Sequence, residues 1–114
     1  MEKIFEQALL YDFYGELLND HQKEIYEEYV LDNLSLSEIA EEHGISRQGV
    51  HDLIKRADKA LNQYENKLGL IRKFVNIKEK VNQINEISVK MAEGMDKEKA
   101  QSIISITNEI LDEL

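Results

Sequence analysis

Residues that could bind nucleic acid gather at the start of a helix predicted near the middle of the chain. Ser46, Arg47, Gln48 and His51 occupy its first two turns. If this helix enters a major groove as the second helix of a helix-turn-helix, its N-terminal residues face the base edges. Arg47 would then bind guanine through two hydrogen bonds and Gln48 would bind adenine, while Ser46 or His51 would reach a phosphate.

More cations follow along the chain. Lys55, Arg56 and Lys59 continue the same helix, at positions that favour contacts to phosphates. A second set, named here the basic band, comprises Lys67, Arg72, Lys73, Lys78 and Lys80. A cationic surface of this kind suits the backbone of DNA or of structured RNA, or an acidic protein. Alternatively, the lysine side chains only cover apolar neighbours with their aliphatic stems.

Acidic residues argue against tight DNA binding by the same segment. Asp52 lies on the proposed reading face, and the pair Glu41–Glu42 ends the preceding helix. The whole chain carries a net charge of −9. Divided along the sequence, this charge is −10 for residues 1–46, +5 for residues 47–80 and −4 for residues 81–114. Any nucleic-acid surface is therefore confined to the basic middle segment.

The sequence lacks the groups that most enzyme and metal sites require. It contains no cysteine, which excludes a thiolate zinc site and a cysteine nucleophile. The histidines His21, His43 and His51 are not spaced as a metal site on one helix face, and the five glycines are too scattered for a phosphate-binding loop. We expect no catalysis, no cofactor and no metal, and we place His43 at the negative end of its helix. The lack of a long apolar run and of cysteine favours a cytoplasmic location.

The elements that position the candidate residues are predicted from caps and apolar spacing. Ala40 is the small residue required where two helices cross, and Gly44 suits the turn between them. Ser35 and Glu38 form a capping box before the first helix, and Ser46 caps the second. Apolar residues that would lock the two helices together are Ile39, Ile45, Val50 and Leu53. This combination predicts a helix-turn-helix.

Helical periodicity and turn residues predict an all-α fold of six helices. Their predicted ranges are residues 2–18, 20–31, 36–43, 46–68, 70–94 and 96–114. The first helix is expected to bury Ile4, Phe5, Ala8, Leu9, Tyr11 and Phe13, and the second Ile25, Tyr26, Tyr29 and Val30. The fourth is expected to bury Val50, Leu53, Ile54, Ala57, Leu61, Tyr64 and Leu68. We divide the chain into a helix-turn-helix bundle over residues 1–68 and a helical hairpin over residues 69–114.

The last two predicted helices share an apolar repeat of about 3.5 residues, which is typical of helices that pack along their length. In the fifth helix the repeat is Leu70, Phe74, Ile77, Val81, Ile84, Ser88, Met91 and Met95. In the sixth, which Asp96 is expected to cap, it is Ala100, Ile103, Thr107, Ile110 and Leu114. The hairpin would pack either on its own bundle or on a second chain, and the length of the repeat favours a homodimer.

Two resemblances agree with this architecture. Residues 18–61, above all Ser35–Leu61, resemble the region-4 helix-turn-helix of bacterial sigma factors. The opening segment Lys3–Leu18, the capped segment that starts at Ser35 and the segment Ser46–Asp52 are similar to the YlxM-type family of small helix-turn-helix proteins. The second resemblance covers about residues 3–87. It implies a DNA-binding fold and a role in the signal recognition particle pathway.

Three functions are consistent with these features. The leading interpretation is an accessory or regulatory helix-turn-helix protein of the signal recognition particle pathway that contacts DNA, RNA or components of the particle. The second is a dimeric transcription regulator that reads a DNA site. The third is a protein-interaction module that has kept the fold but lost nucleic-acid binding, which the acidic flanking segments favour.

Overall fold

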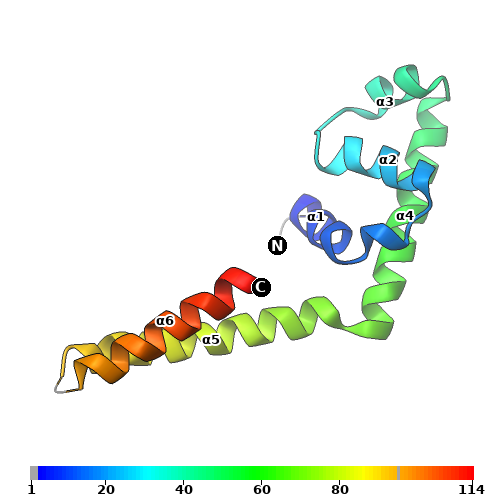
Figure 1. Ribbon diagram of the computed structural model, residues 1–114. Helices are drawn as coiled ribbons and strands as arrows, with labels where there is room; N and C mark the ends of the chain where they lie inside the picture. The colour runs from blue at the N-terminus through cyan, green and yellow to red at the C-terminus, as the bar shows by residue number, and fades with distance from the viewer. Residues whose placement is uncertain (1–2, 95) are drawn as a thin grey trace. The chain divides into compact units, whose positions relative to one another are not determined.

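A computed structural model describes residues 3–94 and 96–114 of the chain (Figure 1). Over these residues the secondary structure consists of six α-helices and one 3-10 turn, with no strand, which confirms the all-α prediction. The elements are α1 (Lys3–Tyr14), η1 (Gly15–Leu17), α2 (Asp20–Val30), α3 (Leu36–His43), α4 (Arg47–Leu68), α5 (Leu70–Ala92) and α6 (Lys97–Glu113). No described helix has both the length and the apolar character that a bilayer-spanning segment requires.

The chain divides into two compact units. The first ends at Ile71 and contains α1 to α4, and the second, Arg72–Leu114, contains most of α5 and all of α6. The sequence predicts a division after residue 68, at the glycine that separates α4 from α5. That glycine, Gly69, has a φ of 63° and ends α4 in the left-handed conformation. The helix therefore breaks at this glycine.

The first predicted helix is shorter than expected. The α-helix ends at Tyr14, and Gly15–Leu17 form a 3-10 turn in place of a continuous helix to residue 18. Gly15 is required by packing, since a Cβ atom at this position would lie 2.7 Å from Cε1 of the Tyr11 ring. After the turn, the Asn19 side chain accepts a hydrogen bond of 2.8 Å from the Gln22 amide and caps α2.

The predicted buried face of α1 is wrong in part. Phe5 is 62% exposed, and Ile4 is also exposed. The residues that α1 buries instead are Gln7, Leu10, Tyr11 and Tyr14. This face is buried because two of its side chains bind carboxylates of α4: Gln7 donates to Asp58, and Tyr14 donates to Glu65. The polar contacts thus rotate α1 away from the orientation that its apolar residues alone predict.

Helix α4 is the scaffold of the first unit, with α1, α2 and α3 packed along it (Figure 1). The largest fully buried side chains of this core are Tyr14, Ile25, Tyr26, Ile39, Val50 and Leu61. The inner face predicted for α4 is confirmed from Val50 to Tyr64. Leu68 is an exception at 48% exposure, because it lies one turn beyond Tyr64, the last residue of α4 that packs against the core.

Three tyrosines of this core bind carboxylates. The tyrosine–carboxylate pairs are Tyr11 with Glu27, Tyr14 with Glu65 at 2.6 Å, and Tyr26 with Asp58 at 2.5 Å. In each pair the phenol hydroxyl donates a hydrogen bond to a carboxylate oxygen. Burial, followed by the neighbouring carboxylate, raises the pKa of each tyrosine above its ordinary value. These three buried tyrosines therefore also fix the orientation of three acidic side chains.

In the second unit, α5 and α6 form an antiparallel hairpin (Figure 1). Its buried residues are Val81, Ser88, Ala100 and Thr107. The two hydroxyls bond within their own helices, Ser88 to the Ile84 carbonyl and Thr107 to the Ile104 carbonyl. Across the hairpin, the amide of Asn85 donates to Asn108 at 2.9 Å. Small residues whose hydroxyls bond within their own helices therefore line the contact.

Four members of the predicted repeat are buried within the hairpin itself. Exposed members of the repeat are Leu70, Ile77, Ile84, Met91, Ile110 and Leu114. By helix phase Ile77, Ile84 and Met91 lie to one side of the contact, so the two helices alone do not cover the whole stripe. Met95 lies outside the described residues. Asp96 occupies the N-cap position of α6, but its side chain makes no capping hydrogen bond, so that prediction is wrong.

Candidate nucleic-acid interface

The predicted helix-turn-helix is formed by α3, a three-residue turn and the start of α4. Ser35 and Glu38 make the expected capping box at the start of α3. Gly44 ends α3 with a φ of 66°, and the Ile45 amide then bonds the Ala40 carbonyl at 3.1 Å. Together these local interactions fix the turn from which α4 emerges.

The first turn of α4 presents polar side chains to solvent. The Ser46 hydroxyl accepts a hydrogen bond of 2.9 Å from the Gly49 amide and caps the helix as predicted. Arg47 and Gln48 are exposed, whereas Val50 is fully buried and anchors this turn to the core. The Gln48 amide nitrogen donates to Asp52 at 3.0 Å. Gln48 must therefore exchange this partner before it can bind a base.

His51 is placed differently from the other candidates. Its side chain is only 43% exposed and lines a small pocket with Lys3, Lys55 and Asp58. Its Nδ1 atom is buried without a hydrogen-bond partner among the described residues and lies 3.8 Å from an Asp52 oxygen, beyond hydrogen-bond range. The imidazole can offer only its other edge to a ligand. Of the predicted base-reading residues, His51 is thus the most constrained.

The outer surface of α4 is strongly cationic. Arg47, Lys55, Arg56 and Lys59 are all exposed, and we name these four residues the α4 cationic face. They spread over roughly half of the helix circumference, since Arg47 and Arg56 lie about 180° apart at about 100° per residue. Asp52 is exposed beside them. The other acid of this stretch is turned inward: the Asp58 carboxylate accepts from the Tyr26 hydroxyl and from the Gln7 amide nitrogen. The surface from residue 47 to residue 59 therefore carries four positive side chains against one exposed carboxylate.

The residues of the basic band are exposed but are not gathered on one face. Lys67 lies in the last turn of α4, whereas the other members belong to α5 and to the second unit. At about 100° per residue, Lys73 and Lys80 share one side of α5 and Lys78 lies roughly 150° away. The Lys78 ammonium sits 5.8 Å from the centre of the Phe74 ring. This contact agrees with lysine stems that cover apolar neighbours.

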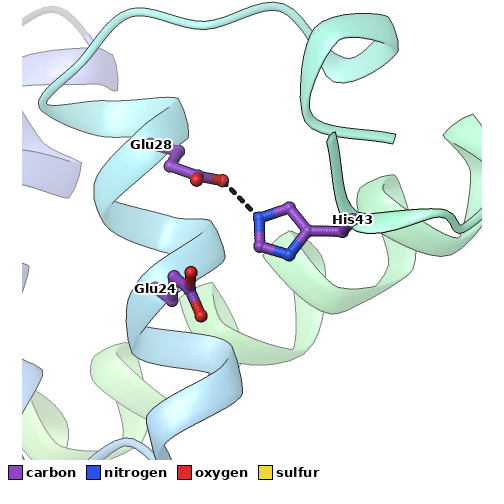
Figure 2. A group of neighbouring side chains, drawn as sticks. All are labelled: Glu24, Glu28 and His43. Carbon is purple, nitrogen blue, oxygen red and sulfur yellow. Dashed lines mark hydrogen bonds and ion pairs between the residues drawn. The ribbon is translucent and has the colours of Figure 1, made fainter. Parts of the chain in front are cut away.

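One cluster was not found from the sequence. The imidazole Nε2 of His43 lies 2.7 Å from a carboxylate oxygen of Glu28, and Glu24 lies one turn earlier on the same side of α2 (Figure 2). This ion pair raises the pKa of His43, chiefly through Glu28. The four-residue spacing of the two glutamates on α2 was a usable signal. Their partner was not visible, because His43 belongs to α3 and meets them only through the fold.

Comparisons with known proteins agree with the fold. Residues 1–104 match the family described as "Putative helix-turn-helix protein, YlxM / p13 like". The chain is 47% identical over 88 residues to UPF0122 protein YlxM of Bacillus subtilis, covering 77% of this chain and 80% of that protein. It is 50% identical over 84 residues to a UPF0122 protein of Acetivibrio thermocellus, covering 74% and 72%. A relative from Bacillus pumilus is 41% identical over 104 residues, covering 91% and 92%.

Proposed function

Because the chain belongs to the UPF0122 family of YlxM-like helix-turn-helix proteins, we propose that it is a regulatory protein that binds nucleic acid through α4. The observation that carries this proposal is the α4 cationic face, whose four side chains are exposed while Asp58 is turned into the core. Duplex DNA and RNA attract such a surface through their phosphates. The family is described by its fold and not by a reaction, and we propose no catalytic role.

The proposed complex places the start of α4 against the base edges. Arg47 would donate to guanine, and Gln48 would read adenine after it releases Asp52. Lys55, Arg56 and Lys59 would contact the phosphates. With Asp52 among these cations, binding is expected to be weak on arbitrary sequences and to depend strongly on salt.

The resemblance to YlxM-type proteins favours a place for this activity in the cytoplasm, in the signal recognition particle pathway. The partner would then be the structured RNA of the particle or one of its proteins. Structured RNA is recognised mainly by shape and backbone contacts, which a cationic helix can supply without reading bases. A DNA-reading transcription regulator is the second candidate, supported by the exposure of Arg47 and Gln48 at the start of α4.

The test measures fluorescence anisotropy of labelled duplex DNA and of structured particle RNA over a series of salt concentrations. A variant with Lys55→Ala, Arg56→Ala and Lys59→Ala should bind more weakly, and its logarithmic salt slope should fall by about 0.9 for each phosphate that it no longer neutralises. Arg47→Ala with Gln48→Ala should instead remove sequence preference. A matched control removes Lys97 and Lys99 from α6 and should bind as the wild type does.

The outcomes separate the candidate functions. Loss of DNA binding in the Arg47 and Gln48 variant, with RNA binding absent, supports the transcription regulator. If Arg72→Glu with Lys73→Glu abolishes binding while the α4 variants retain it, the basic band is the binding surface and the proposal for α4 is wrong. If the protein binds neither DNA nor RNA at low salt, the protein-interaction module is the remaining candidate function.

We also propose that the hairpin joins two copies of the chain. The exposed apolar residues Ile77, Ile84 and Met91 of α5 lie on the same side of the hairpin as Ile106 and Ile110 of α6. Helical phase places both groups beside the buried contact, so they form one apolar face. A second copy of this face would cover it in a four-helix arrangement.

Light scattering across a dilution series tests the dimer. The wild type should have about twice the chain mass of 13.3 kDa, and Ile84→Asp with Ile110→Asp should be monomeric. Because both residues are exposed, the variant should keep the circular dichroism of the wild type. A wild type that is monomeric at every concentration contradicts the proposal.

A further inference from the structure

The contact between α2 and α3 brings together three side chains with the chemistry of metal ligands. Glu24 and Glu28 lie one turn apart on α2, and His43 reaches toward them from the last turn of α3 (Figure 2). One ligand atom from each side chain lies within 4.8 Å of the other two. The side chains of His43 and Glu28 are only 13% and 14% exposed, whereas Glu24 is exposed and faces the solvent side of the cluster.

We propose that Glu24, Glu28 and His43 form a binding site for one divalent transition-metal ion of the zinc class. Zinc sites that keep an open position have three protein ligands, such as histidine and carboxylate, with water in the fourth position. An imidazole among the ligands favours zinc, copper or nickel over magnesium and calcium, which prefer oxygen alone. Metal–ligand distances of about 2.0–2.2 Å would require the side chains to adjust around the ion, and the exposed Glu24 side chain is the one with room to move.

The charges at the cluster favour a cation. The two glutamates repel each other at a spacing of four residues, and Glu42 of α3 adds to the negative potential at His43. His21, one turn before Glu24, contacts the His43 ring edge-on with ring centres 6.1 Å apart and helps to orient it. Without metal, His43 pairs with Glu28 alone at 2.7 Å. A metal ion would balance both glutamates, and because it requires a neutral imidazole its binding should weaken at acidic pH.

The position of the site gives it a structural role. Helix α3 is the first helix of the helix-turn-helix, and its end at Gly44 sets the path of the chain into α4. The site joins the last turn of α3 to the middle of α2. A bound ion would therefore hold α3 in place and stabilise the folded state, because it binds that state alone.

The experiment titrates the metal-free, full-length protein with zinc chloride by calorimetry, and with cobalt chloride by visible absorbance. We expect one ion per chain and a melting temperature that rises with zinc. Glu24→Gln and His43→Gln should each weaken binding by at least about tenfold, the loss found even when outer partners of metal ligands are removed. Glu41→Gln, an exposed glutamate of α3 outside the cluster, and His51→Gln should bind as the wild type does.

Two results would overturn the proposal. One is a wild type that binds no zinc. The other is binding that survives Glu24→Gln or that is lost equally in His51→Gln, since the ion would then occupy another group of side chains. The Glu24→Gln variant is expected to fold, because the substituted side chain is exposed and glutamine is similar in size to glutamate. Circular dichroism of each variant without metal confirms that it remains helical.

Discussion

Alkaline pH is expected to unfold this protein through the three tyrosine–carboxylate pairs. Each phenol is buried and donates a hydrogen bond to a carboxylate. A deprotonated phenolate would lose that hydrogen bond and face a negative charge. For this reason the pKa of each of the three tyrosines is raised in the folded state. In the unfolded chain the same groups titrate near the ordinary tyrosine pKa of about 10.

The sign and size of the effect follow from this difference. Just above pH 10 the unfolded state has lost protons that the folded state still holds, so the free energy of unfolding falls as the pH rises. One tyrosine contributes about 1.4 kcal/mol for each pH unit in this window, and three contribute about 4 kcal/mol. A small domain has a total stability of about 5–15 kcal/mol, so it should unfold within a few pH units. Below about pH 10 the contribution is fully present.

Urea unfolding followed by circular dichroism at a series of pH values measures this slope, and tyrosinate absorbance reports when the phenols titrate. Tyr26→Phe is the matched variant, because it keeps the buried ring and removes one hydroxyl. At neutral pH it should lose about 1.5–3 kcal/mol, the range for a hydrogen bond to a charged group. Above about pH 10 its slope should be smaller by one third. A stability that stays constant from pH 9 to about pH 11.5, or a variant with the wild-type slope, would refute this reasoning.

Three shorter predictions concern the helix-turn-helix. Gly44→Ala should lower the stability by about 1 kcal/mol because φ is 66° at this position, while Gly44→Asn should cost less; thermal unfolding compares them. Asp52→Asn should raise nucleic-acid affinity about threefold at low salt, because a carboxylate placed about 7 Å from a phosphate in the proposed complex would repel it by about 0.6 kcal/mol in water. Equal affinity in anisotropy titrations would show that Asp52 lies outside the interface. The pair of His43 with Glu28 should stabilise the folded state fully below about pH 6.5, and less as the pH rises through the raised pKa of His43. In urea unfolding, His43→Gln should therefore lose more stability at about pH 6 than at about pH 9.

The parts of the fold that were predicted correctly depend on local interactions. The capping box of Ser35, the left-handed Gly44 and the cap at Ser46 each join residues three or four positions apart, so their spacing in the sequence is enough to identify them. The buried face of α1 depends instead on partners more than fifty residues away. Gln7 is a polar residue that no apolar pattern would place in the core, and only its hydrogen bonds to Asp58 explain its burial.

In the candidate site, too, local features could be predicted from the sequence and contacts with distant residues could not. Exposure of Gln48 at the start of α4 follows from helix phase, because at about 100° per residue it lies nearly opposite Val50, which must face the core. The constraint on His51, whose Nδ1 atom is buried, depends on what packs beside α4 and could not be predicted. The pairing of His43 with Glu28 likewise needs the turn between α2 and α3 to bring two helices together. Local spacing identifies which residues point outward, but not which partners they meet.

The inward orientation of two acids reconciles the net charge of the chain with a cationic α4. Asp58 and Glu65 belong to the basic middle segment and lower its formal charge. In the structure both carboxylates bind buried tyrosine hydroxyls, Asp58 that of Tyr26 and Glu65 that of Tyr14. The hydrogen bonds that hold α1 and α2 against α4 thus also remove these carboxylates from its outer surface. A count of charges along the sequence therefore does not describe the outer surface of α4, which from residue 47 to residue 59 exposes four cations and a single carboxylate, that of Asp52.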